Sequence, residues 1–237
     1  IRDVKGGEIV LIKEDGKIIE KQLLPENPHH CIFEYIYFAR PDSVLDGQTV
    51  YEVRFRLGKE LAKEVKKMGL QPDVVIPVPD TARCAALALA EELGVKFREG
   101  LIKNRYIART FIMPRDVDKT QQVKFKLNPI KEEIRGKKVL IVDDSIVRGV
   151  TSKAIVNLIK NVEPMEIYFA SSCPPLRYPC YYGIDMQTRR EFIARDKEVE
   201  EIRKILGVDA LVYQTGEGML RAAGEGRFCT ACFTGDY

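Results

Sequence analysis

In the segment KVLIV at residues 138–142, a lysine is followed by four consecutive apolar residues. This run limits the folds that the chain can adopt. A strand that is apolar at successive positions, rather than at every second one, is buried on both faces. Such strands occur in parallel sheets that helices cover on both sides. Two adjacent carboxylates, Asp143 and Asp144, end the run, and a helical pattern follows over 151–160. The sequence therefore predicts an α/β protein with a central parallel sheet flanked by helices.

Strands and helices alternate along most of the chain. Further helices are predicted over 51–68, 82–93 and 199–206, and further strands over 74–78, 166–171 and 209–213. The helix over 51–68 is the clearest, because its apolar residues recur at four-residue spacing and Gly69 fits its C-terminal cap. Since parallel strands need long crossover connections, this order predicts right-handed βαβ units.

The ends of the chain show different patterns. Residues 1–24 form two alternating runs joined by Asp15-Gly16, which predicts a β-hairpin. The polar linker that follows contains His29 and His30, which we expect on the surface and outside any catalytic role. We expect N-terminal strands and a linker over 1–45, a main domain over 46–215 and a C-terminal helical tail over 216–237.

Composition and charge narrow the function classes. Lys and Arg number 38 against 35 Asp and Glu, and the formal charge of +3 is too small to indicate a nucleic-acid or membrane surface. The sequence has neither an 18-residue apolar run nor a signal peptide, so we expect a cytoplasmic protein without a membrane span. The chain begins with Ile1 rather than Met, which we interpret as processing or as part of a longer chain.

The strongest local signal is VLIVDDSIVRGVTS, at residues 139–152. A helix that begins just after a strand offers free backbone N–H groups and the positive end of its dipole to a phosphate. Gly149 permits close approach of the backbone, while Thr151 and Ser152 add hydroxyl donors. The two carboxylates would repel a phosphate, so they indicate sugar hydroxyls and Mg²⁺ beside it. The alternative is a strand that simply ends in a helix cap.

This segment resembles the phosphoribosyl pyrophosphate (PRPP) loop of the type I phosphoribosyltransferases. A wider set of stretches resembles one branch of that group, the amidophosphoribosyltransferase family. The stretches are CIFEYIYFARPDS (31–43), VVIPVPDTAR (74–83), KNRYIARTFIMP (103–114), VLIVDDSIVRGVTS (139–152), YYGIDM (181–186) and FCTACFTGDY (228–237). The resemblance implies the type I phosphoribosyltransferase fold. It also implies a pentosyltransferase reaction in which ammonia displaces pyrophosphate from PRPP and gives 5-phosphoribosylamine, the first step of purine synthesis.

The resemblance also implies roles for individual residues. The implied PRPP-binding residues are Asp143, Asp144, Ser145, Arg148, Gly149, Val150, Thr151 and Ser152. Within that set, Asp143 and Asp144 hold the ribose hydroxyls and join Thr81 at the Mg²⁺ site. Val150 stands where Thr is commoner, so a backbone N–H contact survives there and a hydroxyl contact does not.

The charged stretch over 103–127 corresponds to a loop that closes over PRPP in the family. The implied catalytic residues are Lys103, Arg105, Tyr106, Arg109 and Lys126. Cations that arrive on such a loop stabilise charge on the leaving pyrophosphate, and closure excludes water. For each of these residues, a place in a solvated basic loop is the alternative.

The cysteines carry a second signal. Cys229 and Cys232 have the spacing of two thiolate ligands in one loop. Resemblance to the iron–sulfur branch of the family implies a 4Fe–4S cluster on Cys31, Cys180, Cys229 and Cys232. A structural zinc site would use the same ligands and is the less favoured alternative. We expect Cys84 in the core and Cys173 outside the ligand set.

The resemblance implies partners as well. Its glutaminase half uses an N-terminal Cys as nucleophile, whereas the first cysteine here is Cys31. We therefore expect a separate glutaminase domain or subunit, together with a homo-oligomer and purine-nucleotide inhibitors. Two other functions stay open, a non-catalytic PRPP-binding regulator and a base-salvage phosphoribosyltransferase. The latter leaves the C-terminal CxxC unexplained, and the former often carries a DNA-binding appendage that these N-terminal strands do not resemble.

Overall fold

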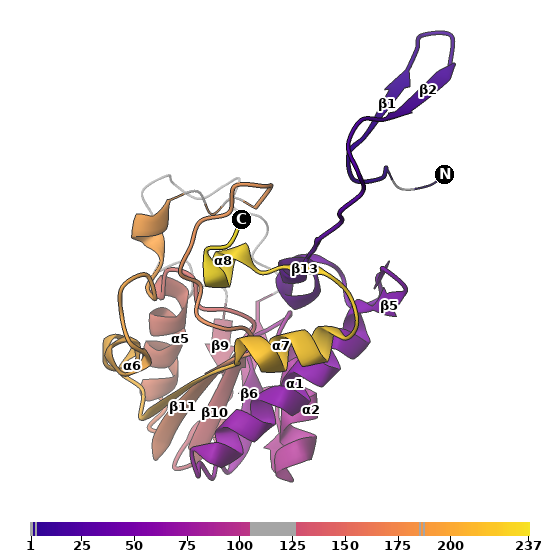
Figure 1. Ribbon diagram of the computed structural model, residues 1–237. Coiled ribbons are helices and arrows are strands. Elements are labelled where there is room, and N and C mark those ends of the chain that lie inside the picture. The colour runs from indigo at the N-terminus through magenta and orange to yellow at the C-terminus, as the bar shows by residue number, and fades with distance from the viewer. Residues whose placement is uncertain (1, 3, 105–126, 185, 187) are drawn as a thin grey trace.

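The computed structural model describes residues 2, 4–104, 127–184, 186 and 188–237. Its centre is a five-stranded parallel sheet in the order β12-β11-β10-β6-β7 (Figure 1). The strands are β6 (Val74–Pro77), β7 (Lys96–Phe97), β10 (Lys138–Asp143), β11 (Glu166–Ser171) and β12 (Ala210–Tyr213). The predicted parallel sheet is confirmed, and only the two-residue edge strand β7 was not expected.

The strand order reverses beside β6. The chain runs outward from β6 to β7 and then returns to place β10 on the other side of β6. Val142 pairs with Pro77 of β6, and Asp143 pairs with Ser171 of β11. The carboxyl ends of β6 and β10 are therefore neighbours at the switch point, which is where open α/β sheets bind ligands.

Helices cover both faces of the sheet. Helices α1 (Val50–Lys67) and α2 (Arg83–Leu93) pack on the face that carries Leu140. Helices α5 (Val150–Lys160) and α6 (Val199–Leu206) pack on the face that carries Ile141. Because neighbouring residues of β10 point into opposite layers, the strand is apolar throughout, as the sequence analysis required.

Helix α1 is the longest helix of the described residues, and its sequence explains why it forms. The Thr49 side chain accepts a hydrogen bond from the Glu52 backbone at 3.3 Å and caps the first turn. The helix buries one stripe: Val50, Val53, Arg54, Leu57, Gly58, Leu61, Ala62 and Val65. It begins one residue earlier than predicted and ends at Lys67, with Gly69 in the left-handed region just beyond.

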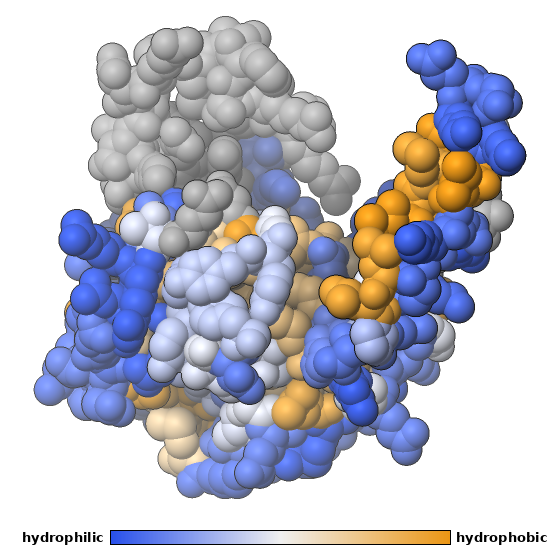
Figure 2. All heavy atoms as spheres, turned by 45° about the horizontal axis from the view of Figure 1, so that its top comes forward, coloured by the Kyte–Doolittle hydropathy of each residue, from blue (hydrophilic) through white to orange (hydrophobic). Residues whose placement is uncertain are grey.

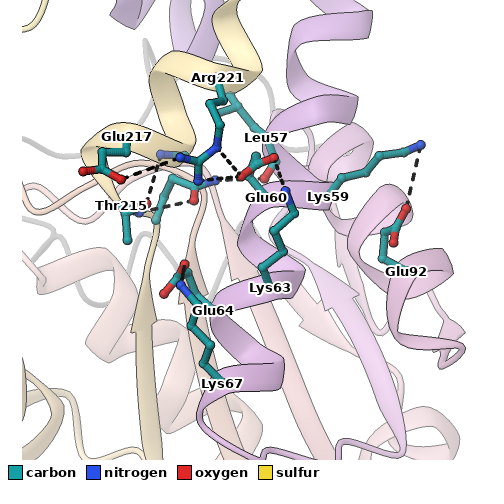
Figure 3. A network of polar contacts seen from close by, with 12 residues as sticks. Leu57, Lys59, Glu60, Lys63, Glu64, Lys67, Glu92, Thr215, Glu217 and Arg221 are labelled. Atoms are coloured by element: carbon teal, nitrogen blue, oxygen red, sulfur yellow. Dashed lines mark hydrogen bonds and ion pairs between the residues drawn. The ribbon is translucent and has the colours of Figure 1, made fainter.

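The outer face of α1 carries a network of ion pairs (Figure 3). Arg221 of α7 (Gly216–Ala223) contacts Glu60 at 3.0 Å, and Lys59 contacts Glu92 of α2 at 3.8 Å. Exposed pairs of this kind contribute little to stability. Apolar packing, including that of Met219 on the inner side of α7, is what holds these helices together.

Besides the two hydrophobic clusters on the faces of the sheet, a third hydrophobic core lies where residues 30–38 meet the C-terminal segment. The strands β3 (His30–Cys31) and β13 (Phe228–Cys229) pair in parallel and bring Cys31 beside Cys229. Below them, the π-helix η1 (Glu34–Phe38) packs with residues of α1, α7 and the C-terminal helix α8 (Ala231–Thr234). The tail is thus part of the folded body.

The short elements complete the described chain. They are β4 (Val44–Leu45), β5 (Gln48–Thr49), β8 (Leu101–Lys103), β9 (Leu127–Pro129), α4 (Lys131–Ile134) and the 3₁₀-helix η2 (Arg189–Glu191). Within the described ranges no helix is long and apolar enough to cross a membrane.

The N-terminal hairpin stands away from the body in Figure 1, as β1 (Glu8–Ile12) and β2 (Ile18–Gln22). Its apolar side chains are exposed, and Figure 2 shows them along the projecting arm: Ile9, Leu11, Ile12, Ile18, Ile19, Leu23 and Leu24. The predicted hairpin is confirmed. An isolated two-stranded hairpin is only marginally stable in water, and exposed apolar side chains of this kind are typical of an interaction surface.

The two histidines differ in their surroundings. His29 is exposed, as expected. The His30 side chain is 42% exposed and its Nδ1 lies 3.0 Å from an Asp46 carboxylate oxygen, so His30 also lies at the surface, as expected.

The closest helix contact yields a stability prediction. A Cβ on Gly58 of α1 would lie 2.1 Å from the Ala85 carbonyl oxygen of α2. We expect Gly58→Ala to lower the free energy of unfolding by about 1–3 kcal/mol, measured by urea denaturation, because backbone cannot yield as a side chain can. Gly216→Ala, where a Cβ meets nothing within 4 Å, is the matched control and should not destabilise. Equal stability of both variants would contradict the α1–α2 packing.

Candidate active site

A cleft of about 690 Å³ opens at the carboxyl ends of β6 and β10. Nine of the residues predicted from the sequence line it: Thr81, Lys103, Asp143, Asp144, Ser145, Arg148, Gly149, Thr151 and Ser152. Val150 is not among the lining residues and its side chain is 43% exposed. That position suits a contact through the backbone alone.

The loop after β10 has the geometry of an anion site. Gly149 precedes α5 with φ of +74°, in the left-handed region, and a Cβ there would lie 2.4 Å from Ile193 Cδ1. The left-handed backbone favours glycine, and any larger residue would also have to move the end of the Ile193 side chain. The first N–H groups of α5 have no acceptor within the helix, so they are available to a phosphate beside Thr151 and Ser152.

Two buried carboxylates lie next to this loop. Asp143 and Asp144 are 8% and 7% exposed. Burial, reinforced by the charge of its neighbour, raises the pKa of Asp143 well above its usual range. Burial also raises the pKa of Asp144 to about 6, although the Ser145 hydroxyl, the Arg54 charge and the Thr81 hydroxyl oppose the shift. Both acids are therefore poised to receive a cation or a hydroxyl donor.

The donor set fits Mg²⁺ with a substrate. Two carboxylates and the Thr81 hydroxyl are hard oxygen donors, which this ion prefers. Across the ranges that the structure describes, no three His, Cys, Asp or Glu side chains form a group that could hold a metal ion by themselves. A magnesium ion here would take further oxygens from a bound phosphate compound, as is usual for this metal.

The sequence analysis did not single out Arg54, which is buried beneath the cleft. Its guanidinium donates to the carbonyl oxygens of Tyr35 at 2.8 Å, Tyr37 at 3.1 Å and Ala39 at 2.8 Å. These lie in the last turn of η1, where carbonyls lack partners within the helix. The same charge acts on Asp144. The position of Arg54, four residues after Val50 on the buried stripe, was the available signal.

Aromatic side chains form one wall of the cleft. Phe33, Tyr37 and Phe38 line it, with ring centroids 4.9 to 6.2 Å apart. The sequence analysis used these residues only as part of the stretch over 31–43 that carries the resemblance, and assigned them no role in the site. Such a wall excludes water from the region above the carboxylates.

Two cations at the rim are paired with carboxylates that the sequence analysis also missed. Lys103 Nζ lies 3.3 Å from an Asp80 oxygen, and Arg148 Nε donates to Glu191 at 2.9 Å. Acidic residues in loops carry no periodic pattern, so nothing in the sequence marked Asp80 or Glu191.

The stretch over 103–127 is described only at its ends. Lys103 ends β8, which pairs antiparallel with β9. The other implied catalytic residues of that stretch lie outside the described residues: Arg105, Tyr106, Arg109 and Lys126.

Four thiols gather at the other end of η1. Burial, together with the charges of the nearby Cys31, Cys229 and Cys180, raises the pKa of Cys232 to about 12. Cys31, Cys180 and Cys229 line a cavity of about 840 Å³. Segments about 200 residues apart in the sequence thus meet at one place.

The turn after Cys180 stabilises a thiolate. Burial raises the pKa of Cys180, but hydrogen bonds from the backbone of Gly183, Ile184 and Tyr182 outweigh it, and the net pKa is lowered. Backbone N–H groups converging on a sulfur in this way form an anion-binding concavity found at iron–sulfur sites.

The remaining cysteines differ from each other. Cys173 is fully buried in the third core and donates from its thiol to the Pro174 carbonyl at 3.3 Å. Cys84 is half-buried rather than in the core, so that expectation was wrong. Burial raises the pKa of both thiols.

Comparison with known proteins identifies the class of this site. The model of the phosphoribosyl transferase domain family matches residues 48–205, which include β6, β10 and the loops after them. The chain therefore belongs to the phosphoribosyl transferase domain family, and its fold is the predicted type I phosphoribosyltransferase α/β fold.

Beyond that domain, the whole chain is similar to amidophosphoribosyltransferases. It is 50% identical over 240 residues to that of Pyrococcus horikoshii, covering 100% of this chain and 51% of the relative. It is 46% identical over 240 residues to that of Methanothermobacter thermautotrophicus, covering 100% and 50%. Glutamine phosphoribosylpyrophosphate amidotransferase from B. subtilis, solved in complex with ADP and GMP, superposes with a TM-score of 0.86 at 42% identity, covering 100% and 53%. The chain thus spans about half the length of these relatives.

The buried acid pair gives a pH-dependent stability prediction. Because the folded pKa of Asp144 is raised to about 6, the stability that the neutral acid contributes is complete below about pH 4 and is lost as the pH rises through 6. Asp144→Asn stays neutral. We would measure the free energy of unfolding of the variant and of the wild type by urea denaturation in the presence of EDTA. The variant's value minus the wild type's should increase by up to about 3 kcal/mol between about pH 4 and about pH 7.5. A difference that does not change with pH would contradict the burial of an ionised Asp144.

Proposed function

We propose that this chain is the phosphoribosyltransferase part of an amidophosphoribosyltransferase, which makes 5-phosphoribosylamine from PRPP and ammonia. The observation that carries the proposal is the convergence of nine predicted PRPP-site residues on one cleft. The similarity of the full chain to enzymes of that name supports it. The reaction would open de novo purine synthesis in the cytoplasm.

Each part of PRPP would bind to a different element of the cleft. The loop that precedes α5 takes the 5-phosphate, through backbone N–H groups from Arg148 to Ser152 and the hydroxyls of Ser145, Thr151 and Ser152. Asp143 and Asp144 accept hydrogen bonds from the ribose hydroxyls. A Mg²⁺ ion held by Thr81, Asp143 and Asp144 would supply positive charge to the pyrophosphate group.

The chemical step needs positioning more than a side-chain nucleophile. The ammonia nitrogen bonds to C1 while the bond from C1 to the pyrophosphate oxygen breaks, and a proton leaves the nitrogen. The transition state has oxocarbenium character, so correctly placed charge lowers its free energy. The aromatic wall of Phe33, Tyr37 and Phe38 keeps water from competing at C1.

Cations near the pyrophosphate complete the proposed site. Lys103 lies at the rim of the cleft and can exchange its Asp80 partner for the leaving group. Arg105, Tyr106, Arg109 and Lys126 are proposed to join it on closure, because charge that arrives with a lid stabilises the departing anion.

The partners follow from the hairpin and from the relatives. The exposed apolar faces of β1 and β2 need cover, and the chain spans about half of each relative. A glutaminase domain or subunit that covers the hairpin and supplies ammonia meets both facts. The B. subtilis relative was solved with ADP and GMP, which supports inhibition of this chain by purine nucleotides. A homo-oligomer is proposed with it on the resemblance alone.

For the four thiols, the proposal is a structural 4Fe–4S cluster on Cys31, Cys180, Cys229 and Cys232. The large cavity and the N–H groups directed at Cys180 support it. A zinc ion would bind four thiolates directly, whereas a 4Fe–4S cluster would bind one thiolate at each of its four iron atoms and spread them further apart. The cluster is proposed over zinc on the resemblance.

Pyrophosphate release from PRPP tests the proposed activity. With Mg²⁺ present, we expect release with ammonium, and none with adenine, hypoxanthine or orotate. Asp143→Asn should lower the rate on the order of 100-fold, as loss of one pre-organised polar contact does. Release only with a base would indicate a salvage enzyme, and PRPP binding without turnover would indicate a regulator.

Metal analysis tests the cluster. We expect a brown protein with about four iron atoms per chain. Chelation of the iron should lower the melting temperature before it weakens PRPP binding, because the thiols join distant segments rather than touch the cleft. Cys232→Ser should lose the colour and Cys84→Ser should keep it. Bound zinc, or earlier loss of PRPP affinity, would contradict a structural iron–sulfur cluster.

A further inference from the structure

The carboxylate of Glu191 lies over the phosphate loop. Arg148 donates to Glu191 Oε2 from Nε at 2.9 Å, and its Nη2 donates to the same oxygen. Both residues line the cleft with Gly149, Thr151 and Ser152. Because both donors use one oxygen, the pair lacks the parallel two-oxygen geometry of the strongest Arg–carboxylate contacts.

The segment that carries Glu191 is fixed against the loop. The Ile193 backbone N–H donates to the Val147 carbonyl at 2.9 Å. The Ile193 side chain occupies the space where a Cβ of Gly149 would stand. One residue further, Arg177 holds the Ala194 carbonyl at 2.8 Å. Glu191 is therefore placed beside the loop by backbone and packing, and not only by its charge.

The contact is exchangeable. The Arg148 and Glu191 side chains are 47% and 45% exposed, and pairs at this exposure contribute little to stability. A phosphate offers Arg148 three oxygens and more charge, at a helix N-terminus that already favours an anion. Glu191 would then stand unpaired within a few ångströms of that phosphate and repel it.

We propose that Glu191 is a displaceable counter-ion of the phosphate loop, which holds Arg148 and weakens the binding of every 5-phosphorylated ligand there. This inference rests on the proposed function, since it assigns the 5-phosphate to this loop. Glu191 touches Arg148 rather than the reacting atoms, so it is a positioning residue. Because Glu191 weakens phosphate binding, compounds that offer the loop a phosphate but lack the pyrophosphate of PRPP dissociate more readily.

Ribose 5-phosphate is the probe, because it presents the phosphate without pyrophosphate. Titration calorimetry on the chain should show that Glu191→Gln binds it about 3- to 10-fold more tightly than the wild type, with the gain fading at high salt. Glu200→Gln is the matched control, since Glu200 pairs with Arg203 at 2.6 Å on α6, away from the cleft. It should bind as the wild type does.

The double variant separates the counter-ion role from a structural one. With Arg148→Gln in place, adding Glu191→Gln should tighten binding by a smaller factor, because only the direct repulsion is left to remove. Binding by Glu191→Gln that equals or falls below the wild type would overturn the inference and leave the proposed function intact. No binding of ribose 5-phosphate by the wild type would overturn both.

Discussion

Two carboxylates buried side by side at the end of a central strand govern the rest of this structure. Asp143 and Asp144 lie where solvent is nearly absent, and burial opposes their ionisation. The molecule compensates in part with the Ser145 and Thr81 hydroxyls and with the charge of Arg54. What is left uncompensated is an affinity for a cation and for hydroxyl groups, which the proposed Mg²⁺ and ribose would supply.

The sheet determines where that affinity acts. Strand β10 must be apolar on both faces to carry the acids into the interior, and its neighbour β6 ends at the Thr81 loop. Helix α5 then begins at Val150, directly after Gly149, so the proposed phosphate site lies beside the acids without further elements. Arg54 connects this centre to the aromatic wall, because one guanidinium holds the end of η1 and acts on Asp144.

How much the sequence could predict depends on how each element is encoded. Helix α6 was predicted residue for residue and α1 within one residue, because apolar spacing and caps are local. The edge strand β7 and the π-helix η1 were missed, since elements of two to five residues depend on tertiary contacts. Glu191, at the end of the three-residue η2, and Asp80, in a loop, are charges that no periodic pattern marks. The meeting of Cys31 with Cys180 came from resemblance, as no local pattern joins residues so far apart.

The central claim is that the turn after β10 receives the phosphate and the acid pair receives the sugar. A crystal structure of this chain with PRPP and Mg²⁺ measures this most directly. The account predicts the 5-phosphate on the backbone N–H groups that open α5, and the ribose hydroxyls on Asp143 and Asp144. PRPP bound elsewhere, with this turn empty, would contradict it.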